Sequence, residues 1–100
     1  MANKLKIDFD QLNDTIKDYE KSIDEFETLV NTLTASVDAL KNSGWKSAAS
    51  DAFFKTFDET WKKNIEMHIK ILIHLKECLN YAKTEYETLY NSIPSIGNSL

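Results

Sequence analysis

Residues that interrupt helices are almost absent from this chain of 100 residues, and their positions constrain its fold more than any other feature. The chain has two glycines and one proline, which are Gly44, Gly97 and Pro94. Residues 1–43 and 45–93 therefore contain neither glycine nor proline. Folds built from strands need turn residues every 8–12 positions or so, and the sequence excludes most of them. The spacing predicts two long helices joined by one turn.

The first of these segments has apolar residues at alternating intervals of three and four, which is typical of a helix that packs along one face. These residues are Phe9, Leu12, Ile16, Tyr19, Ile23, Phe26, Val30, Leu33, Val37 and Leu40. Asp8 is suited to an N-cap, and Gly44 is suited to the left-handed position after a helix. We predict a helix over about residues 8–42 and a turn over residues 43–47.

The second segment predicts a helix over about residues 48–91, with Ser47 or Ser43 as its N-cap. Its apolar series is Phe54, Phe57, Trp61, Ile65, His68, Leu72, Leu75, Leu79, Ala82, Tyr86, Leu89 and Ile93. Around Trp61, two successive intervals in this series are four residues long, so the pattern departs there from the regular heptad.

The last residues, 92–100, contain Pro94 and Gly97 but no apolar period, and we expect a flexible tail. Because only a short turn separates the two helices, they must fold back on each other. The predicted fold class is all-α, a single domain over residues 1–100 that consists of an antiparallel helical hairpin.

A second apolar series on the second helix exceeds what one partner helix can cover. It comprises Met67, Ile71, His74, Cys78 and Tyr81, and Ile69 and Ile73 also lie outside the first series. A helix that is apolar around most of its girth is normally buried on more than one side. A chain this short also buries only a small core alone. We expect the first four residues of this series to form a dimer face, through which two hairpins make a four-helix bundle.

Composition excludes several classes of function. The net charge is -4, and the twelve basic residues are all lysine, so the arginine forks that read phosphate and guanine are absent and nucleic-acid binding is not expected. No apolar stretch is long enough to span a bilayer. Residues 1–9 contain no apolar run like that of a cleaved signal peptide.

No group of residues has the spacing of a catalytic, cofactor or metal site. His68 and His74 are six positions apart and lie on different sides of a helix, whereas ligands on one helix are three or four apart. His74, Glu77 and Cys78 share a face but have no fourth ligand, and we assign His74 and Cys78 to the second apolar series. With no nucleophile motif and no glycine-rich loop, we expect neither an enzyme nor a cofactor.

Two features are not explained by hairpin packing alone. Trp45 lies in the turn, where it either covers the end of the core or is presented to a partner. Tyr81 and Glu85 lie one helical turn apart on the second helix, and they either present a ring and a carboxylate to a partner or, for Tyr81, extend the dimer face.

These residues resemble the WXG-100 proteins of bacterial type VII secretion, the ESAT-6-like family. Such proteins are helical hairpins of about one hundred residues with a Trp-x-Gly turn and a Tyr-x-x-x-Asp/Glu motif late in the second helix. The corresponding segments here are Trp45-Lys46-Ser47 and Tyr81-Ala82-Lys83-Thr84-Glu85. Similar members carry a small residue, an aromatic and a second tryptophan at the positions of Ala52, Phe53 and Trp61. Ser47 replaces the family glycine, which admits backbone angles that serine avoids.

The resemblance implies a small, non-enzymatic protein that is secreted without a cleaved signal peptide and recognised by the type VII secretion ATPase. It assigns the secretion signal to Trp45, Ser47, Tyr81 and Glu85. It also implies a partner, which is a second copy of the chain, a related WXG-like chain or a toxin chain.

Two other functions fit the same residues. The protein could be a helper that pairs with the helical targeting domain of a larger LXG-type toxin, or an intracellular helical-bundle adaptor. The abundance of lysine, asparagine and isoleucine without arginine suggests an AT-rich coding sequence, as in many low-GC Gram-positive bacteria.

Overall fold

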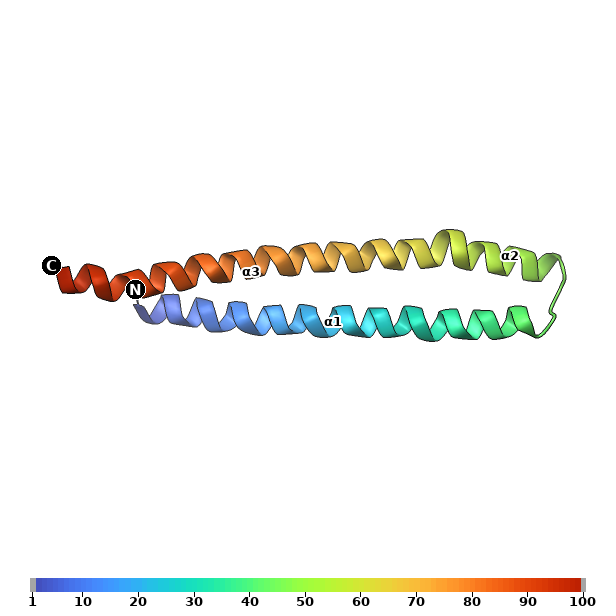
Figure 1. Cartoon of the computed structure of the whole chain (residues 1–100), viewed down its shortest axis with the longest axis horizontal. Coiled ribbons are helices and arrows are strands. Elements are labelled where there is room, and N and C mark those ends of the chain that lie inside the picture. The colour runs from blue at the N-terminus through green and yellow to red at the C-terminus, as the bar shows by residue number, and fades with distance from the viewer. Residues whose placement is uncertain (1, 100) are drawn as a thin grey trace. The chain divides into compact units, whose positions relative to one another are not determined.

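The computed structural model describes the backbone of residues 2–99 and the side chains of residues 9–89, and over these residues it contains helices and no strand. The elements are α1 (Ala2–Asn42), α2 (Ala48–Thr56), the π-helical turn η1 (Phe57–Trp61) and α3 (Lys62–Ser99), which Figure 1 shows in chain order. The predicted all-α class and the pair of long helices are confirmed.

The chain packs as two units. Residues Ser22–Leu72 form one unit, here called the turn unit, which contains the connection between α1 and α2. Residues Met1–Lys21 and Ile73–Leu100 form the other, here called the terminal unit. No helix among the residues described combines the length and the hydropathy that crossing a bilayer requires.

Hydrogen bonds at both ends define the turn. The Ser43 N–H donates to the Ala39 carbonyl at 3.0 Å, and Gly44 follows with φ of +84°, the left-handed conformation that glycine adopts without strain. At the start of α2, the Ser47 hydroxyl accepts from the Ser50 N–H at 3.2 Å, while the Ser50 hydroxyl accepts from the Ser47 N–H at 2.8 Å. This reciprocal capping box fixes the first turn of α2.

Both long helices extend further than the sequence pattern indicated. α1 begins at Ala2, ahead of the start expected at Asp8, because no glycine or proline precedes Asp8 to end the helix. α3 continues to Ser99 through the segment expected as a flexible tail, residues 92–100, of which Leu100 lies outside the described residues. Pro94 removes one backbone donor, and its fixed φ is itself helical.

The core of the turn unit forms where α1 faces the second helical segment. Its buried apolar residues are Ile23, Val37, Phe57 and Ile69. Leu33 and Leu40, which belong to the heptad series of α1, are exposed at the edge of this core, and Thr34 is half-buried. A strict heptad drifts by roughly 20° per repeat on a straight helix, which turns the row of Leu33 and Leu40 outward and Thr34 inward, while Val37 stays buried.

The π-helical turn changes which residues of α3 face α1. The Lys62 N–H donates to the Phe57 carbonyl, five residues back, and one extra residue is thereby accommodated. Ile69, assigned by the sequence to the outer series, is consequently 8% exposed, whereas His68, assigned to the core series, is exposed. His68 keeps one contact, an edge-to-face approach to Phe26 with ring centroids 5.1 Å apart.

The terminal unit has a core of its own. Ile16 is buried on α1, and Ile73 and Leu79 are half-buried on α3. Leu75, also expected in the core, is 40% exposed, because the register set by the π-helical turn places Ile73 inward in its stead.

Candidate protein-interaction site

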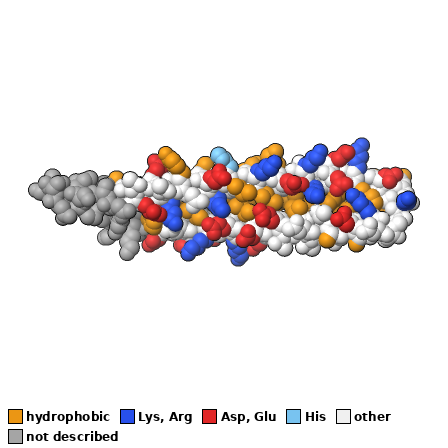
Figure 2. Space-filling view, in the orientation of Figure 1, with side chains coloured by type: hydrophobic (Ala, Val, Ile, Leu, Met, Phe, Trp, Pro, Cys, Tyr) orange, Lys and Arg blue, Asp and Glu red, His pale blue; other side chains and the backbone are white. Residues whose placement is uncertain are grey.

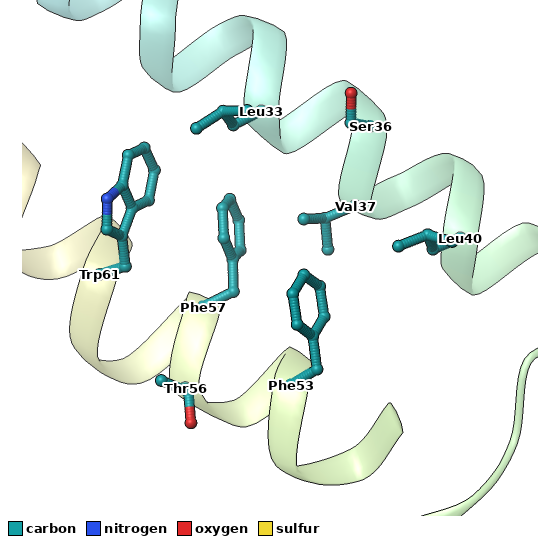
Figure 3. Close-up of a pocket in the computed structure, with 8 residues that line it drawn as sticks. All are labelled: Leu33, Ser36, Val37, Leu40, Phe53, Thr56, Phe57 and Trp61. Carbon is teal, nitrogen blue, oxygen red and sulfur yellow. The ribbon is translucent and has the colours of Figure 1, made fainter. Parts of the chain in front are cut away.

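An apolar groove runs along one edge of the turn unit. It has a volume of about 360 Å³. Its lining residues, labelled in Figure 3, are Leu33, Ser36, Val37 and Leu40 of α1 and Phe53, Thr56, Phe57 and Trp61 of the second helical segment. Val37 and Phe57 form its buried floor, and Leu33, Leu40 and Phe53 form an exposed rim.

Two small polar residues, Ser36 on α1 and Thr56 on α2, are among those that line the groove. Figure 3 shows their hydroxyl oxygens pointing away from the phenylalanine rings, which leaves carbon to line the groove. Such a surface favours an apolar side chain of another helix over a polar ligand.

Stacked aromatic rings form one wall of the groove. Phe57 and Trp61 have ring centroids 5.2 Å apart and planes inclined by 19°. Both belong to the π-helical turn, so the same distortion that changes the register of α3 also presents these two rings side by side. An offset stack of this kind adds roughly 0.5–1.5 kcal/mol beyond burial.

An ion pair joins α1 to the π-helical turn. Lys41 and Asp58 each follow a groove-lining residue by one position, which rotates them by about 100° from it. The Lys41 Nζ lies 3.2 Å from the Asp58 Oδ2, and it also lies 5.4 Å from the centroid of the Phe54 ring. An exposed ion pair of this kind adds little stability.

The turn residue Trp45 packs against the start of α2. Its ring centroid lies 6.1 Å from that of Phe53 and 5.7 Å from that of Phe54. The Trp45 side chain nevertheless remains 39% exposed. The tryptophan therefore covers two rings at the start of α2 and keeps more than a third of its surface exposed.

Ser47 occupies the position of the family glycine without strain. Its φ of -166° and ψ of 172° are extended backbone, which any residue adopts. Its hydroxyl also supplies the N-cap of α2. Serine therefore fits this position of the turn without backbone strain.

Tyr81 and Glu85 lie on α3 and belong to the terminal unit, whereas Trp45 and Ser47 belong to the turn unit. Tyr81 is 69% exposed and Glu85 is also exposed. Together with Thr84, Thr88 and Leu89 they line a shallow hollow of about 440 Å³.

The residues expected to form a dimer face are exposed in the single chain. Met67 is 56% exposed, and Ile71, His74 and Cys78 are also exposed. On the face shown in Figure 2, hydrophobic side chains lie at the surface between acidic and basic ones. The Nε2 of His74 lies 3.8 Å from the Sγ of Cys78. Over the described residues of one chain, no three His, Cys, Asp or Glu side chains are grouped so as to hold a metal ion.

Sequence reasoning missed the groove. Leu33 and Leu40 were assigned to the core because they continue the heptad, and Phe53 was noticed only through the family resemblance. The signal that could have found them is the length of the heptad run, since drift accumulates with each repeat.

Comparison with known proteins agrees with this fold and turn. The family model WXG100, described as proteins of 100 residues with WXG, matches residues 4–89. No curated protein and no solved structure matches the chain. The matched region includes the capped turn at Trp45, the groove and the Tyr81–Glu85 segment. The chain therefore belongs to the WXG100 family, the ESAT-6-like family of type VII secretion substrates.

Proposed function

We propose that this protein is exported by a type VII secretion system and acts, without catalysis, by pairing with another helical chain. The observation that carries the proposal is the groove of the turn unit, which is apolar and open. A monomeric protein gains nothing from exposing Leu33, Leu40 and Phe53 together. An amphipathic helix that covered them would remove this surface from water.

The first choice of partner is a second copy of the chain. Two hairpins that cover each other's apolar surfaces make a four-helix bundle, and the exposed Met67, Ile71, His74 and Cys78 would form part of the contact. A related WXG-like chain would satisfy the same surfaces.

The secretion signal is proposed to consist of Trp45 and Ser47 in the turn and of Tyr81 and Glu85 on α3. Its accessibility supports this, because the type VII ATPase could bind the exposed Tyr81 ring and the exposed part of Trp45 without unfolding a helix. We further propose that export removes no signal peptide, so that the secreted chain keeps its N-terminal residues.

The test is export from a host that encodes the chain and its secretion system. Trp45→Ala and Tyr81→Ala should each remove the protein from the culture medium and leave it in the cells, with unchanged helical circular dichroism. Glu85→Gln should also reduce export. Its matched control is Glu87→Gln, which alters an exposed carboxylate two positions away that pairs with Lys83 at 4.0 Å. Normal export of Trp45→Ala and Tyr81→Ala would refute the assignment.

The location of the groove favours a second candidate, a helper for a larger toxin. None of Met67, Ile71, His74 and Cys78 lines the groove, so a helix of a foreign chain could occupy the groove in place of a second copy's. Co-expression with a toxin's helical targeting domain would then give a one-to-one complex that Leu33→Asp abolishes. Retention of the wild-type chain in the cells would instead favour an intracellular adaptor.

A further inference from the structure

We propose that His74 and Cys78 form half of a zinc site, which two copies of the chain complete together. The proposal rests on the pairing of two copies suggested above and adds a metal ion to it. Within the described residues of one chain no metal site is complete.

The spacing of the two side chains is that of a chelate. A tetrahedral zinc ion with a Zn–N distance of about 2.0–2.1 Å and a Zn–S distance of about 2.3 Å holds the two ligand atoms about 3.5 Å apart. The Nε2 of His74 and the Sγ of Cys78 are 3.8 Å apart in the metal-free chain. A shift of a few tenths of an ångström brings both onto one ion, and such a shift is within the freedom of exposed side chains on one helix face.

The two ligands are accessible. Both side chains are exposed. Their separation of four positions on α3 points both of them in the same direction. An ion can therefore reach the pair without rearrangement of the helix.

A second copy supplies the missing ligands. A structural zinc site needs four ligands, and one chain offers two within its described residues. In a two-fold symmetric contact each surface meets its own copy. If two α3 helices cross antiparallel with the axis between His74 and Cys78, each histidine faces the other copy's cysteine. Two imidazoles and two thiolates then surround one point.

The surroundings of the pair fit this arrangement. Leu75, which is 40% exposed, flanks the pair on one side and would be covered by its own copy. The exposed carboxylate of Glu77 flanks the other side. Two such carboxylates near the axis would repel each other unless a cation lies between the chains. Zinc matches this set of nitrogen and sulfur ligands, whereas calcium and magnesium prefer oxygen.

The experiment measures zinc and mass on the same sample. The chain is freed of metal with a chelator, kept reduced with a phosphine and titrated with zinc chloride while light scattering follows its mass. We expect one zinc ion for every two chains and a zinc-dependent rise toward twice 11.5 kDa. Cobalt(II) in place of zinc should give a thiolate-to-cobalt charge-transfer band.

Three variants make the test specific. His74→Ala and Cys78→Ser should each weaken zinc binding at least tenfold and abolish the zinc-dependent rise in mass. His68→Ala, which removes the other histidine, should bind zinc as the wild type does. One zinc ion per chain, no zinc binding, or binding without a change in mass would overturn the proposal. A dimer that forms equally with and without zinc would overturn the role of the metal and leave the proposed pairing standing. Export of Cys78→Ser tests the secretion function separately.

Discussion

At the scale of single residues, Ser47 shows how a side chain can replace what a glycine supplies. The family pattern has glycine at this position, yet the backbone here is extended and demands none. Serine adds a hydroxyl that accepts from the Ser50 N–H, and the departure from the pattern therefore becomes a helix cap. The sequence offered Ser47 and Ser43 equally as caps, and only the fold of the turn distinguishes them.

Replacing this cap should have a graded effect on stability. Ser47→Ala should lower the free energy of unfolding by about 1 kcal/mol, because it leaves an N–H at the start of α2 without its acceptor. Ser47→Gly should cost only a few tenths of a kcal/mol. Urea denaturation of the two variants and the wild type measures both values. Equal losses for alanine and glycine would show that the hydroxyl does not cap the helix.

Thr34 is a residue at which a polar atom opposes stability. Its Oγ1 is buried and has no hydrogen-bond partner. Thr34→Val keeps the shape and exchanges the hydroxyl for a methyl group, which should raise the free energy of unfolding by about 1 kcal/mol. The melting temperature should then rise by about 4–8 °C. Thr32→Val, at an exposed position of the same helix, is the control and should change little. An equal rise in both variants would point to helix propensity instead.

At the scale of elements, the π-helical turn separates what the sequence predicts from what it does not. Heptad spacing predicts two long helices and the glycine-marked turn between them, because these depend on local residue types. The sequence shows two successive four-residue intervals at Trp61. A helix can accommodate this irregularity either by relaxed supercoiling or by one extra residue in a turn. Packing against α1 decided this, and with it whether His68 or Ile69 faces the core.

Deleting a residue should therefore have opposite consequences inside and outside η1. Deletion of Glu59 removes the extra residue and keeps Ile65 and Ile69 facing α1 on a regular helix, so the stability should stay within about 1 kcal/mol of the wild type. Deletion of Lys70, an exposed residue of regular α3, rotates everything after it by about 100°.

The Lys70 deletion should thus expose Ile73 and Leu79 and cost more than about 3 kcal/mol. Thermal unfolding followed by circular dichroism compares the two deletions directly. Equal destabilisation would mean that the π-helical turn does not set the register.

At the scale of the whole molecule, the chain exposes more apolar surface than its small core can balance alone. The sequence indicated this excess through the second apolar series. It did not indicate the groove, because the groove brings together residues of two helices, and the drift of the α1 heptad has its effect only once these helices are packed. The sequence thus predicts that the chain pairs, but it does not predict which surface forms the contact.

A charge placed on the groove rim should separate pairing from folding. With zinc present, wild-type protein at micromolar concentration should have a mass near twice 11.5 kDa. Leu33→Asp should weaken the pairing at least tenfold, because it would bury a carboxylate against the partner, while the exposure of Leu33 leaves the helical circular dichroism intact. Thr32→Asp adds the same charge at the neighbouring exposed position and should leave the mass unchanged. A Leu33→Asp variant with the mass of the wild type would exclude the groove from the contact.

The division into two units also gives each of them its own optical label. Both tryptophans, Trp45 and Trp61, belong to the turn unit, whereas the tyrosines, Tyr19, Tyr81, Tyr86 and Tyr90, all belong to the terminal unit. Indole emission therefore reports on the turn unit alone, and phenol absorbance, separated from that of indole in the second-derivative spectrum, reports on the terminal unit. Without any added dye, the natural chain can reveal whether heat releases the chain ends first or melts both halves in one transition.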